Sequence, residues 1–140
     1  MELFFYCRSN ILKRKRRQNA GRCETERGNR MTIREWVDGL ALRVLAEGKD
    51  PDAQLAGCYI GDLLSRAISR GVPGGVWITI MANLNVAAVA LLAEIPCVVL
   101  AEGVEAPDDL REKCREEGIF LLGSGQSAYE LAAAFAQMQQ

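Results

Sequence analysis

The alternation of apolar and polar positions is clearest between Val76 and Gly103. The run VWITI at its start is almost wholly apolar and β-prone, which favours a central strand buried on both faces. A polar turn follows, then small apolar residues that predict a helix over 86–93, and then a second apolar strand over 97–100. The segment ends on another polar turn, so it predicts a strand–helix–strand unit.

The pattern on either side of this unit predicts further elements of both kinds. We expect helices over about 33–39, 62–70 and 107–117 and one starting at 127, with strands over 42–46, 54–60 and 119–122. Capping boxes at Thr32–Glu35 and Ser127–Glu130 mark two helix starts, and Asp62 and Asn85 are the predicted N-caps of two others. Strands and helices that alternate with short connections predict parallel βαβ units with right-handed crossovers. The expected fold is an α/β layered sandwich with a mostly parallel sheet of about five strands.

Charge divides the chain into two parts. Among 140 residues, residues 1–30 hold nine Lys and Arg against three acidic residues, and residues 31–140 hold eight against fifteen. The length suits one core, so we expect one α/β domain over 31–140 after a basic, disordered extension over 1–30. Because the capping box follows Met31 directly, Met31 is the expected natural start. The basic run 13–17 is the alternative, an arm for nucleic acid, but it has no interleaved aromatic residues and nucleic-acid binding is not expected.

Several classes of chemistry lack the residues they need. The chain has no histidine, which removes the common nucleophile–base pairs, and its five cysteines form no CxxC pair. We therefore identify no catalytic residue, no metal site and no cofactor. No apolar stretch is long enough to span a bilayer and no signal peptide is evident, so we expect a cytoplasmic protein without membrane contact.

Polar side chains follow the predicted strands at 81–85, 101–105 and 123–127. The carboxyl ends of parallel strands meet at one edge of a sheet, where ligands bind. Our ligand-binding candidates at this edge are Asn83, Asn85, Glu102, Gly103, Ser124 and Ser127. For Asn85 and Ser127 helix capping competes with ligand binding, and for Glu102 the alternative is a structural anchor that accepts backbone amides.

The domain resembles the DRTGG family over nearly all of 31–140. The residues that carry the resemblance are GCYIGDLLS at 57–65, VWITIMANLNVAAVALLAE at 76–94, VVLAEGVEAPDDL at 98–110 and SAYELA at 127–132. At the positions that give the family its name, this chain has Asn83-Leu84-Asn85 and Ala101-Glu102-Gly103, so only Gly103 is shared. The resemblance implies a fold similar to the amino-terminal domain of HPr kinase/phosphorylase and an accessory role.

Two functions follow as expectations. The first is a noncatalytic regulatory or protein-interaction module of a bacterial protein, which associates with itself as a homodimer or with a protein partner. The alternative is a sensor that binds a nucleotide or a phosphorylated metabolite at the carboxyl edge of the sheet. An enzyme is not expected, and a kinase least of all, because the chain has no GxxxxGK[ST] loop.

Overall fold

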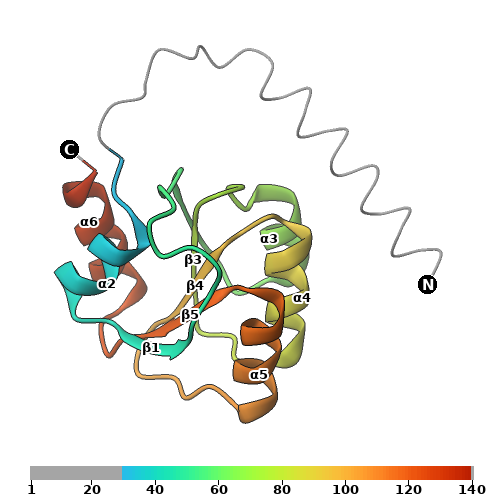
Figure 1. The fold of residues 1–140 in the computed structure, drawn as a ribbon. Helices are drawn as coiled ribbons and strands as arrows, with labels where there is room; N and C mark the ends of the chain where they lie inside the picture. The colour runs from blue at the N-terminus through green and yellow to red at the C-terminus, as the bar shows by residue number, and fades with distance from the viewer. Residues whose placement is uncertain (1–29, 140) are drawn as a thin grey trace.

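A five-stranded sheet organises the computed structural model, which describes residues 30–139 (Figure 1). The strands are β1 (Arg43–Ala46), β2 (Cys58–Ile60), β3 (Val76–Thr79), β4 (Cys97–Leu100) and β5 (Phe120–Gly123). They follow the order β1-β5-β4-β3-β2, in which β2 to β5 are parallel and β1 runs antiparallel to β5. The predicted α/β fold with a mostly parallel sheet is thereby confirmed.

Helices cover both faces of this sheet. They are α2 (Ile33–Leu40), α3 (Leu64–Arg70), α4 (Leu84–Leu92), α5 (Asp108–Glu117) and α6 (Ala128–Met138). Figure 1 shows α3, α4 and α5 against one face, with α2 and α6 against the other. We call α3, α4 and α5 together the helix layer. All three connect neighbouring parallel strands, so they run side by side in one direction.

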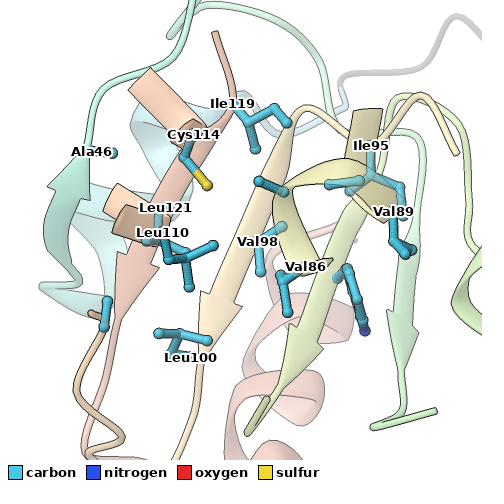
Figure 2. Close-up of a cluster of buried hydrophobic side chains, with 14 of the residues drawn as sticks. Ala46, Val86, Val89, Ile95, Val98, Leu100, Leu110, Cys114, Ile119 and Leu121 are labelled. Carbon is cyan, nitrogen blue, oxygen red and sulfur yellow. The ribbon is translucent and has the colours of Figure 1, made fainter. Parts of the chain in front are cut away.

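Two apolar cores lie on the two faces of the sheet. Every residue of β3, β4 and β5 is buried, as expected for strands covered by helices on both sides. Under the helix layer, Val98, Leu100 and Leu121 pack with Val86 and Leu110 (Figure 2). On the opposite face a second cluster holds side chains of α2 and α6, including Trp36 and Phe135. Their rings pack edge to face, with the ring centroids 5.2 Å apart.

Two helix N-caps differ from the prediction by one or two residues. Helix α4 begins at Leu84 with Asn83 as N-cap, because the Asn83 side chain accepts from the Asn85 amide at 3.0 Å. The N-cap of α3 is Leu63, which makes no side-chain cap, and Asp62 serves another purpose described below. Both predicted capping boxes, at α2 and at α6, are present.

The boundaries of the strands also shift. The predicted strand over 54–60 is shorter, because β2 contains only Cys58–Ile60 and Gln54 instead forms an isolated antiparallel bridge with Thr32. The last strand ends at Gly123 rather than at Leu122. The basic run 13–17 and almost all of the predicted extension over 1–30 lie outside the described residues. Within residues 30–139, no helix is long and apolar enough to cross a membrane.

Candidate functional site

The loops that follow β3, β4 and β5 meet at the carboxyl edge of the sheet. Two backbone hydrogen bonds carry the pairing just past the strands. Ala101 donates to the Thr79 carbonyl at 3.0 Å, and Ser124 donates to the Leu100 carbonyl at 3.0 Å. The loops that hold Asn83, Glu102 and Ser124 therefore start next to one another at one edge.

The loops after β4 and β5 are bonded directly to each other. The Glu102 amide donates to the Gln126 carbonyl at 2.8 Å, and the Gly103 amide donates to the Ser124 carbonyl at 2.8 Å. The Ser124 side chain is 8% exposed, and its oxygen accepts from the Gln126 amide at 3.1 Å. Ser124 is thus engaged in holding its own turn together, which reduces what it can offer to a ligand.

Glu102 enters this network through its backbone alone. Its φ of 59° lies in the left-handed region, and the next residue, Gly103, has a φ of 72°. The carboxylate of Glu102 is exposed and makes no hydrogen bond or ion pair within the described part of the chain. The expectation that this carboxylate anchors a neighbouring loop is therefore wrong, because the turn after β4 directs it into solvent.

Asn83 and Ser127 both cap helices. Asn83 caps α4, and the Ser127 hydroxyl accepts from the Glu130 amide at 3.2 Å while the Glu130 carboxylate accepts from the Ser127 amide at 2.8 Å. Asn85 lies in the first turn of α4, where its side chain is exposed. Of the six candidates, Asn85 and Glu102 therefore keep exposed side chains that have no structural task.

Asp62 has a structural role that the sequence did not reveal. Its Oδ1 accepts from the Thr79 hydroxyl and from the Ile80 amide, both at 2.9 Å, which joins the ends of β2 and β3. Thr79 in turn accepts from the Met81 amide at 3.1 Å. An aspartate shortly before a helix is typical of an N-cap, and that pattern hides its use by a neighbouring strand.

A charged cluster at the β1 side of this edge was also missed. The Glu105 carboxylate lies 3.8 Å from Arg43 of β1 and 3.7 Å from Arg111 of α5. Arg111 also donates from Nε to the Ala106 carbonyl at 3.1 Å. The cluster exists because β1 pairs antiparallel with β5, which places Arg43 opposite Gly123. Apolar periodicity does not report that pairing, so the sequence offered no signal for it.

The thiols in the described residues are poor nucleophiles. Burial raises the pKa of both Cys58 and Cys114 to about 11, and burial raises the pKa of Cys97 further. Because the thiolate is the reactive form, these pKa values disfavour cysteine catalysis near neutral pH. Residues 30–139 also contain no group of three or more acidic or cysteine side chains that is arranged to hold a metal ion.

Aliphatic side chains are exposed where β2 and β3 end. Ile60 is the last residue of β2, Ile80 follows β3, and Leu63 and Leu84 stand at the starts of α3 and α4. We call these four residues the apolar corner. Leu63 is the most exposed of the four, at 60%. The corner adds an apolar surface next to the polar loops of the edge.

A known structure shares this fold. It is the crystal structure of the CBS and DRTGG domains of the regulatory region of Clostridium perfringens pyrophosphatase, complexed with its activator, diadenosine tetraphosphate. The match has a TM-score of 0.63 at 8% identity and covers 77% of this chain and 47% of that chain. No family model and no curated protein matches the chain. The likeness shows a DRTGG-related fold, and this chain spans less than half the length of that regulatory region.

Proposed function

We propose that this chain is a noncatalytic regulatory module that acts by binding protein. The observation that carries the proposal is how the carboxyl edge uses its polar groups. Asn83, Ser124 and Ser127 accept hydrogen bonds from the backbone of their own loops and helices, and Asp62 accepts from the Ile80 amide after β3. Besides Asn85 and Glu102, the surface that remains is the apolar corner, and exposed aliphatic side chains in one region are typical of a binding surface for protein.

The shared fold supports this assignment. The similar structure belongs to the regulatory region of an enzyme, so a DRTGG-related fold is compatible with control of another domain or protein. An enzymatic role has less support, because the described thiols have raised pKa values and the whole chain has no histidine. A bacterial, cytoplasmic setting stays part of the proposal.

The experiment is a comparison of bait proteins in extracts of the native host. The full chain and a variant with Leu63→Ser and Ile80→Ser are immobilised, and bound proteins are quantified by mass spectrometry. A Tyr129→Ser variant is the control, because Tyr129 is 82% exposed and lies on α6, across the sheet from the helix layer. The proposal predicts that the wild type and the control bind one enzyme in stoichiometric amount. The double variant should not bind that enzyme. That enzyme's activity then changes when the purified chain is added.

A ligand sensor is the second candidate. The observation that favours it is the pair of exposed side chains without a structural task, Asn85 and Glu102, next to a backbone turn held in the left-handed region. The related structure contains a dinucleotide activator, which makes nucleotides the first compounds to test. A ligand present at 100 times its dissociation constant adds about 2.7 kcal/mol to the free energy of unfolding. A thermal-shift series with diadenosine tetraphosphate, ATP, AMP and acetyl phosphate tests this, and an unchanged melting temperature throughout contradicts it.

A further inference from the structure

Helix α4 carries one polar side chain, Asn85, and is otherwise apolar on every side, although it forms part of the surface. Its sequence LNVAAVALL contains no charged residue, and its inner face buries Val86, Ala87, Val89 and Ala90. On its outer face Leu84 is 46% exposed and Leu91 is 43% exposed. Ala88, half-buried between them, completes a stripe at spacing i, i+4, i+7. A helix that is apolar all round is normally buried on all sides, so the outer face of α4 is a surface to be covered.

The two helices beside α4 carry opposite charge. Helix α4 contacts α3 on one side and α5 on the other, as Figure 1 shows. On α3 the exposed charges are Arg66 and Arg70, and the helix has no acidic residue. On α5 the exposed residues include Asp109, Glu112 and Glu116. The outer surface of the helix layer therefore runs from basic through apolar to acidic.

The basic residues of α5 do not neutralise the charge of its acidic side chains. Lys113 is bound to its own helix, with Nζ 2.9 Å from Glu117 and 3.8 Å from Glu116. Arg111 is turned toward Glu105 and the Ala106 carbonyl. Arg115 lines a hollow with residues 44–48, so it lies on the β1 side of α5, away from α4. The net charge that faces outward beside α4 is thus negative.

We propose that a second copy of this chain covers the helix layer, related by a two-fold axis that runs parallel to α4. Such an axis places α4 on the partner's α4 in the same direction, and it places α3 on the partner's α5. Arg66 and Arg70 then face Glu112 and Glu116 of the partner subunit, at both ends of the interface. This inference deepens the proposed function, on which it rests, by naming one protein partner.

Charge complementarity selects both the occupant and the axis. The main alternative, a two-fold axis perpendicular to the helices, would set α3 on α3 and α5 on α5. Like charges would then face each other across both rims, which is unfavourable. A second copy carries the basic, apolar and acidic stripes in the order that the parallel axis requires, because a two-fold interface is built from one surface twice.

The size of the surface fits an interface of modest strength. Helices of seven to ten residues rise about 1.5 Å per residue, and their axes lie about 10 Å apart, so the layer measures roughly 15 by 30 Å. Stable interfaces bury about 800 Å² on each partner, and the flat area of this face, roughly 450 Å², lies below that value, as is typical of a weak, transient interface. The small side chain of Ala88 lets the two α4 helices approach closely. We expect a dissociation constant in the micromolar range.

The first test measures mass by sedimentation velocity and light scattering from low to high micromolar concentration. The full chain of 15.4 kDa is expected at twice that mass at the upper end. Ala88→Glu places a charge in the apolar stripe and should weaken the dimer at least tenfold. Ala136→Glu is the matched control, since it makes the same change at an exposed position of α6 and should leave the dimer intact. Circular dichroism confirms that both variants fold.

The second test reverses charges. Arg66→Glu with Arg70→Glu should weaken the dimer, and so should Glu112→Arg with Glu116→Arg. A chain that carries all four changes should recover most of the affinity, because each α3 again faces a partner helix of opposite charge. Recovery of the affinity supports the parallel axis. If the fourfold variant dimerises more weakly than either double variant, the parallel axis is wrong.

Other outcomes overturn the inference as a whole. The inference is wrong if the wild type stays at 15.4 kDa at the highest concentration. It is also wrong if Ala88→Glu leaves the dimer unchanged. Failure here is distinguishable from failure of the proposed function. A monomer that still binds and alters an enzyme refutes only the dimer, whereas a dimer that binds no enzyme refutes only the regulatory role.

Discussion

The Thr79 hydroxyl donates a 2.9 Å hydrogen bond to Asp62 Oδ1, which fixes the end of β3 to the loop after β2. Thr79 is 2% exposed, so removal of the acceptor leaves a buried hydroxyl with one partner fewer. Asp62→Ala should lower the free energy of unfolding by about 1.5 kcal/mol, measured by urea denaturation. Asp62→Asn keeps an Oδ1 acceptor and should lose much less. An unchanged stability in Asp62→Ala would mean that this bond contributes nothing.

The cap of α4 can be tested at two neighbouring asparagines. Asn83→Ala removes the side chain that accepts from the Asn85 amide and should cost about 1 kcal/mol of stability. Asn85→Ala, in an exposed position of the first turn, should change stability by less than about 0.5 kcal/mol. Thermal denaturation of both variants gives the comparison. The reverse order would restore Asn85 as the cap.

The conformation of Glu102 gives a third prediction. A φ of 59° is strained for every residue except glycine, and most of all for a β-branched residue. Glu102→Val should therefore destabilise the protein by about 1 kcal/mol, whereas Glu102→Gly should leave stability unchanged within about 0.5 kcal/mol or raise it. Chemical denaturation separates the two. A clear loss in Glu102→Gly would show that the carboxylate stabilises the turn after all.

The half-buried Cys58 and the buried Cys114 should resist alkylation. With a pKa of about 11, the Cys58 thiol is ionised at about one part in a thousand at pH 8, so iodoacetamide should modify native Cys58 and Cys114 very slowly. Peptide mapping by mass spectrometry follows each cysteine separately. In urea at the same pH, both should react at the rate of an ordinary thiol. Fast modification of the half-buried Cys58 in the native protein would contradict its raised pKa.

The fold was predictable because its central strands are buried on both faces. The runs at β3, β4 and β5 are continuous and apolar, and the helix that follows β5 starts with a recognisable capping box. Edge strands carry less information. Only three residues of the predicted strand over 54–60 pair with β3, and the direction of β1 depends on its partner rather than on its own sequence.

The side chains of the candidate site were harder to predict than its location. Sequence order and parallel pairing place three loops at one edge, but the hydrogen bonds that occupy the Asp62 side chain come from Thr79 and Ile80, at the end of another strand. The Arg43–Glu105–Arg111 cluster depends on the antiparallel pairing of β1 in the same way. The charge order across the helix layer needs three helices to be placed side by side, which no single stretch of sequence shows.

Salt should weaken self-association. The pairs proposed between Arg66, Arg70 and the partner's acidic residues lie at the rim of the interface, where ions screen them. An increase from about 0.05 to about 0.5 M NaCl shortens the screening length severalfold and should raise the dissociation constant several times. Sedimentation velocity at both salt concentrations measures this. Tighter association at high salt would indicate an interface without these charge pairs.

The most direct test of the account is an NMR dilution series on the full chain, with amide shifts recorded from high to low micromolar concentration. We predict that the concentration-dependent amide shifts lie on α3, α4 and α5 and are largest around Ala88. The amide shifts of α2 and α6 should stay constant. Spectra that do not change with concentration, or changes centred on α2 and α6, would contradict it.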